Sequence, residues 1–171
     1  IFDIGDPARP RYKNTVGPAW GIATSMNEGE YLFIGGQQGM YIYTVGGDEP
    51  PFVSQFTHRR NCDPVAVEGA RAYVTLRSNN SMCGGQDNQL DILDISNIKN
   101  PLLLKSYMLT SPYVLAVRGG MVVVCDGTGG LRVLDVRDGG DVRGVFHATD
   151  IVPHDVILSG GLMVVSTDGG Y

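Results

Sequence analysis

The chain has 171 residues, of which 43% are hydrophobic and 18% charged, a balance typical of a globular domain and not of a disordered chain. Its 13 Lys and Arg residues against 18 Asp and Glu residues give a net charge of -5, which argues against a protein that binds nucleic acid through a basic surface. No apolar run reaches the roughly 18 residues that a membrane-spanning helix needs. The 24 glycines are scattered without a fixed period and predict many tight turns.

The apolar runs along the chain are short, rich in Val, Ile, Leu and Tyr, and bounded by Gly, Asp, Asn or Pro, which is typical of β-strands. No stretch carries the 3.6-residue apolar period with caps that a helix requires. In chain order the predicted strands are 1–4 and 10–15, then 20–24, 31–35, 40–45 and 52–56, then 63–68, 72–76, 90–95 and 102–107, then 113–117, 121–125, 131–136 and 142–147, and finally 154–158 and 162–167.

A repeat of about 41 residues organises these strands. Its first marker is an apolar–x–apolar–x–Asp–apolar motif, complete at 90–95 and 131–136, truncated at 1–4 and varied at 40–45. The residues at the Asp position of the motif are 41, 50 and 41 residues apart: Asp3, Thr44, Asp94 and Asp135. A second marker lies seven residues beyond each of them: Pro10, Pro51, Pro101 and Val142. Because two independent markers share one spacing, they indicate a true internal repeat.

Four strands in each unit of about 40 residues are the signature of a β-propeller, in which every blade is a four-stranded antiparallel sheet. The alternative all-β fold, a sandwich, needs no fixed four-strand repeat. We therefore predict an all-β chain and a single propeller domain over 1–171. Full blades are expected at 19–61, 62–111 and 112–153 and half-blades at 1–18 and 154–171, which together make four blade-equivalents.

The arrangement of the two half-blades stays open. The chain begins inside a strand without an initiator Met and ends just after a turn, so we expect it to be part of a larger propeller of seven or eight blades. Alternatively, the opening half-blade supplies strands three and four, the closing half-blade supplies strands one and two, and together they close a small four-bladed ring. Open edges would invite pairing, so an isolated fragment should dimerise or aggregate.

Four segments resemble LVIVD repeats: Asp94–Pro101, Val122–Val136, Tyr73–Ser78 and Cys83–Ile92. The resemblance implies a bacterial β-propeller, mostly secreted or surface-exposed and often a lipoprotein. The implied location is therefore extracellular or outer-membrane-associated, with any lipid anchor outside this chain. Thr44 and Val142 depart from the repeat pattern, and members of the family generally carry more repeats. The resemblance says almost nothing about activity.

Cys62 and Cys83 are expected on one face of one blade. Cys62 lies in the connection between two blades, and Cys83 lies in a nine-residue insertion within 77–89, between a second and a third strand. In a propeller these two kinds of connection share a face; we call it the insertion face. A Cys62–Cys83 disulfide would close a loop of about 20 residues, worth roughly 3 kcal/mol, and would imply an oxidising compartment. Two unrelated free thiols are the alternative.

Cys125, in an apolar strand pattern, is predicted to be a free, inert core thiol.

The candidate binding residues lie on the same face. By alignment of the repeats, Trp20, Asp63, Tyr113 and His154 begin the innermost strands and line the mouth of the central channel, with Asp155 beside the last. Such mixed polar and aromatic rims favour ligand binding. Three arginines on this face, Arg59, Arg60 and Arg77, could hold an anionic group or a partner's carboxylate. The plain alternatives are that the aromatic residues cover the edge of the core and that the arginines are solvated loop charges.

No catalytic residue, metal site or cofactor is predicted. The sequence lacks a nucleophile elbow, an HExxH motif, a phosphate-binding loop and a CxxC pair. Neighbours on a strand point to opposite sides, so His154 and Asp155 should not form a dyad. The Gly-rich segments 126–130 and 138–141 suggest calcium but lack the ligand alternation of an EF-hand loop, and tight turns are the preferred interpretation.

The leading hypothesis is a non-catalytic module that binds a protein or glycan partner, or acts as a scaffold, at the bacterial cell surface. One alternative is a hydrolase or lyase in which Asp63, Tyr113 and His154 converge at the channel mouth, which is an argument from fold alone. Another is a purely structural subunit of an envelope assembly.

Overall fold

The computed structural model describes residues 1–15, 24–46, 51–58, 64–78, 87–138 and 141–169, with the side chains of 24–27 left undescribed. Over these described residues the fold is all-β apart from one 3-10 turn, η1 (Gly127–Gly129). The described residues contain no helix that is long and apolar enough to cross a membrane.

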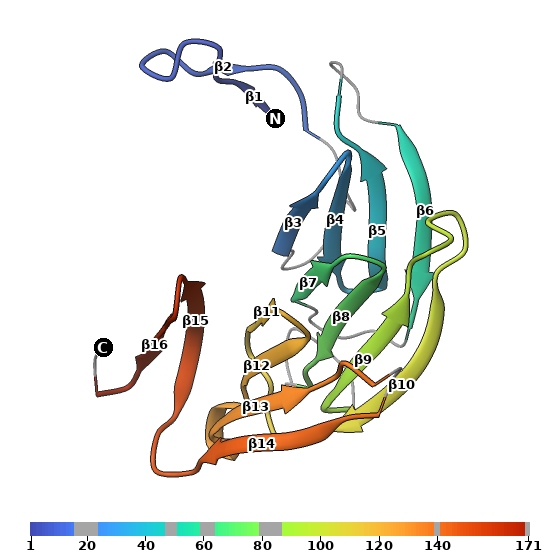
Figure 1. Ribbon diagram of the computed structural model, residues 1–171. Helices are drawn as coiled ribbons and strands as arrows, with labels where there is room; N and C mark the ends of the chain where they lie inside the picture. Colours follow the sequence, from blue (N-terminus) through green and yellow to red (C-terminus); the bar gives the residue numbers. More distant parts are fainter. Residues whose placement is uncertain (16–23, 47–50, 59–63, 79–86, 139–140, 170–171) are drawn as a thin grey trace.

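Three antiparallel four-stranded sheets form the body of the protein (Figure 1). The first contains β3 (Thr24–Glu28), β4 (Tyr31–Gly36), β5 (Gly39–Thr44) and β6 (Phe52–Thr57). The second contains β7 (Val65–Glu68), β8 (Arg71–Leu76), β9 (Gln89–Asp94) and β10 (Leu102–Met108). The third contains β11 (Leu115–Arg118), β12 (Met121–Cys125), β13 (Leu131–Asp135) and β14 (Arg143–Ala148). In each sheet the strands lie in chain order.

Two further sheets have two strands each. The hairpin of β1 (Phe2–Asp3) and β2 (Arg11–Tyr12) precedes the first sheet, and the pair β15 (Pro153–Ser159) and β16 (Leu162–Thr167) follows the third. The prediction of an all-β chain built from antiparallel four-stranded units is confirmed.

Tight turns set the same geometry in each unit. The first and second strands are joined through a glycine in the left-handed region, at Gly29, Gly69, Gly119 and Gly160, with φ between 58° and 60°. Residues other than glycine are disfavoured at this φ. These four glycines therefore mark one equivalent position in each unit.

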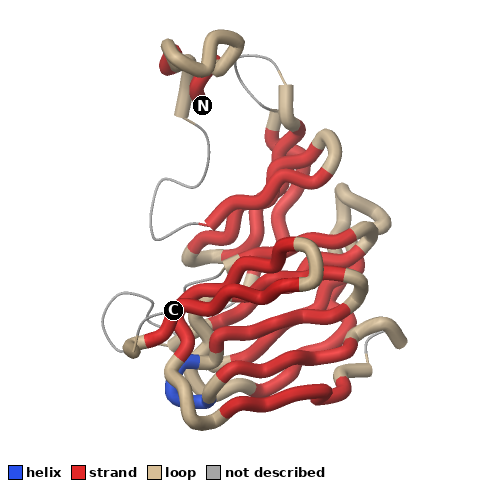
Figure 2. The backbone as a smooth tube through the Cα atoms, turned by 60° about the vertical axis from the view of Figure 1, so that its left-hand side comes forward, coloured by secondary structure: helices blue, strands red, loops and turns tan. Residues whose placement is uncertain are grey.

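The sheets pack face to face, and the hydrophobic core lies between them. Successive side chains of a strand point to opposite faces of its sheet, so each sheet contributes to a core on both sides. In β12, Val122 and Val124 pack against the second sheet, whereas Val123 and Cys125 pack toward β15. The first strands β3, β7, β11 and β15 contact one another in order. They lie on the inside of an arc whose outside is formed by β6, β10 and β14 (Figures 1 and 2). This is the arrangement of propeller-like blades.

One predicted strand was misplaced. The first strand of the first sheet was predicted over 20–24, but β3 runs from Thr24 to Glu28; residues 20–23 lie outside the described residues. The physical reason is the turn at Gly29, which ends β3 at Glu28 just as Gly69 ends β7 at Glu68. Apolar content alone placed this strand four residues too early.

Candidate functional site

Two sets of equivalent positions meet on the insertion face. Tyr113 and His154 each lie six residues before a turn glycine, Gly119 and Gly160. Tyr113 therefore lies just before β11, and His154 is the second residue of β15. Arg77, Gly127 and Asp168 each lie six residues beyond the first residue of a second strand, β8, β12 or β16. The first set therefore comes from the inner edge of the blades, and the second from the ends of the strands beside it.

Tyr113 is held at the centre of this region. Its backbone N–H donates a 2.7 Å hydrogen bond to the Cys125 carbonyl oxygen. Its ring lies against Gly127, where an added Cβ would be 2.8 Å from the ring Cε2 and 2.9 Å from the Ser111 carbonyl oxygen. Gly127 also has a φ of 51°. The absence of a side chain at Gly127 thus leaves the space that the Tyr113 ring needs.

Arg77, from the second blade, lies over the Tyr113 ring of the third. Its guanidinium carbon is 4.1 Å from the ring centroid, which is the geometry of a cation–π contact. The side chain is half-buried. The contact restricts the guanidinium against the face of the ring.

His154, from the last pair of strands, approaches Tyr113 from the other side. The two rings are edge to face, with centroids 5.3 Å apart. His154 Nε2 lies 2.5 Å from Asp168 Oδ1, and both side chains reach solvent. Arg77, Tyr113, His154 and Asp168 therefore form one continuous row across three neighbouring sheets, which we call the mouth row.

The structure separates His154 from Asp155 as the sequence predicted. Asp155 is exposed, and its Oδ1 accepts a 2.8 Å hydrogen bond from the Val156 N–H. The carboxylate that pairs with His154 is Asp168, which the sequence analysis missed. Its Asp-Gly-Gly context was assigned to a turn, although its spacing from the start of β16 equals that of Arg77 from the start of β8.

Several predicted residues lie outside the described residues, and their roles stay predictions. They are Trp20, Arg59, Arg60, Cys62, Asp63 and Cys83. The proposed Cys62–Cys83 disulfide is among them. Cys125 is described, and the prediction of a free, buried thiol is confirmed; burial raises its pKa to about 12.

Asp126 fastens the loop that leads to Tyr113. The carboxylate is fully buried and accepts hydrogen bonds from the N–H groups of Thr110 (2.8 Å) and Ser111 (2.7 Å) and from Arg132 Nε (2.8 Å). Residues 126–130 close on themselves through an Asp126 N–H to Gly130 carbonyl bond of 2.9 Å. The predicted tight turn at 126–130 is thus confirmed, and its carboxylate is engaged by protein donors.

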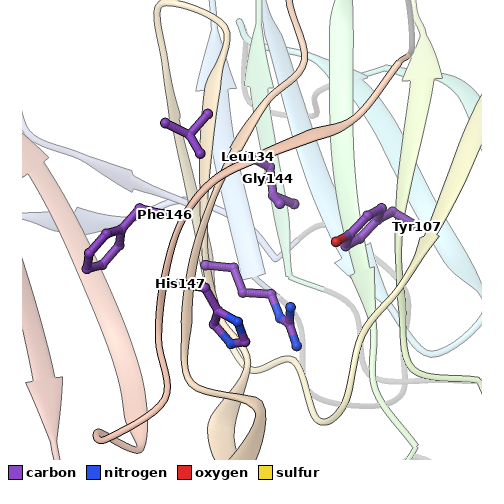
Figure 3. Close-up of a pocket in the computed structure, with 7 residues that line it drawn as sticks. Tyr107, Leu134, Gly144, Phe146 and His147 are labelled. Atoms are coloured by element: carbon purple, nitrogen blue, oxygen red, sulfur yellow. The ribbon is translucent and has the colours of Figure 1, made fainter.

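A second concave region lies on the outer flank, between β10 and the β13–β14 pair. This groove has a volume of about 270 Å³ and is lined by Tyr107, Arg132, Leu134, Gly144, Val145, Phe146 and His147. Figure 3 shows Tyr107 on one side of it, with Phe146 pointing away from Tyr107. Arg132 already pairs with Asp126, and His147 Nε2 lies 2.6 Å from the Gly129 carbonyl oxygen. Because its arginine and its histidine are both engaged, the groove is a weaker candidate than the mouth row.

Comparison with solved structures identifies the fold. The computationally designed Ika4 protein matches with a TM-score of 0.67 and 11% identity, covering 94% of each chain. The designed Ika8 protein matches with a TM-score of 0.63 and 13% identity over 85% of this chain but 42% of its own. Glutaminyl cyclase from Myxococcus xanthus matches with a TM-score of 0.50 and 13% identity over 79% of this chain and 56% of its own. The chain thus spans less than two thirds of two of these three proteins.

No curated protein sequence matches the chain. The family comparison is positive: residues 59–109 match the family model of the LVIVD repeat. This segment covers the second four-stranded sheet, from the connection before β7 to the end of β10. The resemblance drawn from the sequence is therefore confirmed, and the chain carries an LVIVD repeat, a repeat associated with β-propeller folds.

Proposed function

We propose that this propeller module is a non-catalytic binding protein whose mouth row binds a carboxylate-bearing partner, a protein or an acidic glycan, at the bacterial cell surface. The observation that carries the proposal is the Arg77 guanidinium stacked on Tyr113, 4.1 Å from the ring centroid. Stacking holds the planar fork of donors in place, so less conformational entropy is lost when it binds a carboxylate.

The electrostatic setting supports an anionic ligand at this position. Arg77 contacts the Tyr113 ring directly, whereas Asp168, the carboxylate of the mouth row, contacts His154. Arg59 and Arg60, which the sequence repeat predicts on the same face, would add to the positive charge. His154 and Asp168 extend the row with further hydrogen-bonding groups.

The cell-surface location is supported by the resemblance of the repeats to LVIVD proteins, which are mostly secreted or surface-exposed. Labelling of intact source cells with a membrane-impermeant amine reagent tests it directly. Labelling of this protein, with a cytoplasmic marker left unlabelled, supports the proposal. Labelling that appears only after lysis would contradict it.

The binding site is tested with a matched pair of charge-removing variants. Arg77→Gln removes the stacked cation, whereas Lys99→Gln removes an exposed cation from the connection between β9 and β10, at the opposite end of the same blade. Binding is measured against immobilised acidic glycans and acidic peptides, with their neutral counterparts alongside. We expect Arg77→Gln to weaken acidic-ligand binding at least tenfold and Lys99→Gln to leave it unchanged. Equal binding by both variants and the wild type would overturn the site.

One observation favours the enzymatic alternative enough to test. His154 Nε2 contacts Asp168 at 2.5 Å beside the Tyr113 ring, and a carboxylate that orients a histidine is a common arrangement for a general base. A hydrolase or lyase built here would use His154 as the base, Asp168 to orient it and Tyr113 as a neighbouring hydroxyl. If the protein turns over any ester, glycoside or uronate substrate, His154→Gln should reduce kcat at least a hundredfold. Activity that survives this change removes the alternative.

A further inference from the structure

The groove on the outer flank lies where the third sheet lacks a side chain that the other two full sheets carry. In each of them one residue of the outer strand pairs with the residue just before the Asp position of the repeat: Phe52 in β6, Leu103 in β10 and Gly144 in β14. Phe52 and Leu103 carry large apolar side chains that are 56% and 49% exposed. Gly144 carries none and lines the groove of about 270 Å³ between the second and third sheets. The glycine therefore opens space that an apolar side chain would occupy.

The backbone at Gly144 does not require a glycine. Its φ is not positive, unlike that of the turn glycines, and an added Cβ would meet no heavy atom within 4 Å. Its cross-strand partner Leu134 is buried toward the second sheet. Because cross-strand partners lie on one face of a sheet, a side chain at Gly144 would also point toward the second sheet. Neither backbone conformation nor a close neighbour accounts for the glycine at this position.

The walls around Gly144 are largely apolar and come from two sheets. Tyr107 of β10 packs with Leu134 against the core between the second and third sheets. Val145 and Phe146 of β14 are exposed and complete the apolar lining. Figure 3 shows the Tyr107 hydroxyl directed toward the other lining residues. Apolar walls with a few polar groups are typical of ligand sites.

Arg132 supplies a cation to the same groove. It lies two residues before Leu134 on β13, so both side chains leave the same face of the strand. Asp126 accepts a 2.8 Å hydrogen bond from its Nε, and within the described part of the chain the two terminal nitrogens have no acceptor. Asp126 also accepts bonds from the N–H groups of Thr110 and Ser111, so three donors share its negative charge. The guanidinium is thus oriented by Nε and can bind an anion through its terminal nitrogens.

The remaining polar lining carries no negative charge. The groove is lined by no Asp or Glu among the residues that the structure describes. His147 Nε2 lies 2.6 Å from the Gly129 carbonyl oxygen, and since a carbonyl oxygen only accepts, this nitrogen carries the hydrogen. A carboxylate beside Arg132 would therefore meet no like charge from the lining. The groove is complementary to an apolar group that carries a negative charge.

We propose that this groove is a second binding site, separate from the mouth row, and that it takes the C-terminal residue of a partner peptide ending in Leu or Phe. The apolar side chain fills the space beside Gly144, and the α-carboxylate binds the terminal nitrogens of Arg132. A C-terminal apolar residue carries both groups on one Cα, which suits a groove in which Gly144 and Arg132 line a single space of about 270 Å³. An internal apolar residue lacks the carboxylate, and a C-terminal Gly lacks the side chain.

Fluorescence polarisation with labelled hexapeptides tests the ligand chemistry. The probe is Gly-Ser-Gly-Ser-Gly-Leu, labelled at its N-terminus and ending in a free carboxylate. One control is the same peptide with a C-terminal amide, and the other ends in Gly in place of Leu. We expect the probe to bind at least tenfold more tightly than either control. Equal binding of the acid and the amide would overturn the proposal, and so would the absence of probe binding.

Filling the groove tests where the peptide binds. Gly144→Leu introduces the residue type that Leu103 provides in the second sheet, into space that is open around the added Cβ, and should weaken probe binding at least tenfold. The matched control is Gly161→Leu, in the turn between β15 and β16. An added Cβ there also meets nothing within 4 Å, and the φ is not positive. This control should bind the probe as the wild type does. Unchanged binding by a folded Gly144→Leu variant would overturn the site.

A charge pair at an exposed lining residue gives a test that leaves the buried residues intact. Val145 is 54% exposed, so Val145→Asp and Val145→Lys should both fold. Val145→Asp places a carboxylate beside that of the probe and should weaken binding several-fold, whereas Val145→Lys should not weaken it. Equal binding of the two variants would contradict a carboxylate in the groove.

Arg77→Gln separates the groove from the mouth row. Arg77 does not line the groove, so this variant should bind the probe as the wild type does. Loss of probe binding in Arg77→Gln, with binding retained in Gly144→Leu, would place the peptide on the mouth row and overturn the second site.

Discussion

The strands β12 and β16 have nearly the same apolar sequence and very different surroundings. Met121–Cys125 reads MVVVC and Leu162–Thr167 reads LMVVST. In β12 the residues after Met121 are buried, whereas β16 begins with three exposed residues. The difference arises because β13 and β14 pair beyond β12, and β15 packs on its outer face. Burial in this fold is therefore a property of the neighbouring strands and blades, and the strand's own sequence does not decide it.

Removal of a carboxylate should give the largest difference in stability between the full sheets and the β15–β16 pair. Asp126→Ala leaves the Arg132 guanidinium and two backbone N–H groups without their acceptor in a buried setting, which typically costs about 3–5 kcal/mol. Asp168→Ala removes a carboxylate that is 72% exposed and should cost no more than about 1 kcal/mol. Urea unfolding of both variants measures the contrast, and equal costs would contradict it.

Apolar truncation should show the same difference. Leu134 is fully buried between the second and third sheets, so Leu134→Ala should lower the free energy of unfolding by about 2–5 kcal/mol. Leu162→Ala should cost less than about 0.5 kcal/mol in the monomer. Equal costs for the two truncations would contradict the difference in burial.

Two glycines beside the mouth row should respond differently to substitution by alanine, and the larger loss of stability should be intermediate in size. Gly127→Ala forces a Cβ against the Tyr113 ring at a φ of 51° and should cost about 1–3 kcal/mol. Gly169, next to Asp168, has only the Thr167 hydroxyl at 3.9 Å from an added Cβ, so Gly169→Ala should be nearly neutral. Gly127→Ala should also weaken ligand binding, because it displaces Tyr113 from beneath Arg77. Binding that is retained in a folded Gly127→Ala variant would show that this position of the ring is not required.

The sequence predicted the strand grouping because two markers, the Asp position and the Pro seven residues later, recur with the same spacing. It also selected Arg77, Tyr113 and His154, since repeat alignment places them on one face. Contact between residues of neighbouring blades depends on how the blades pack, and a one-dimensional repeat contains no such distance. The Arg77–Tyr113 stack could therefore be found only in three dimensions.

The misplaced first strand and the missed Asp168 have a different cause. The turn glycines are a third marker with the same role in each unit, and counting back six residues from Gly29 leads to Ala23, not to the predicted rim residue Trp20. The same count forward from the start of each second strand aligns Asp168 with Arg77. Both signals are present in the sequence as spacings from turn glycines and strand starts, which apolar content does not show.

The reactivity of a thiol tests the difference in burial between β12 and β16 at a single position. Cys125 is buried against the β15–β16 pair, and burial raises its pKa to about 12. Ser166 occupies the equivalent position in β16, the fifth of the strand, and lines a hollow on its open face. In the folded monomer at pH 8, an introduced Ser166→Cys thiol should react with iodoacetamide far faster than Cys125, since the thiolate is the reacting form.

The raised pKa of Cys125 also predicts the direction of a pH effect on stability. Above about pH 9 the thiol of the unfolded chain loses its proton, while that of the folded chain retains it up to about pH 12. The unfolded state then binds fewer protons, so the contribution of Cys125 to the free energy of unfolding should fall with rising pH, by at most about 1.4 kcal/mol per pH unit. Comparison with Cys125→Ala between pH 8 and pH 10.5 isolates this slope. A wild-type slope identical to that of Cys125→Ala would mean that the thiol is exposed, and that the full sheets and the β15–β16 pair differ less than their burial indicates.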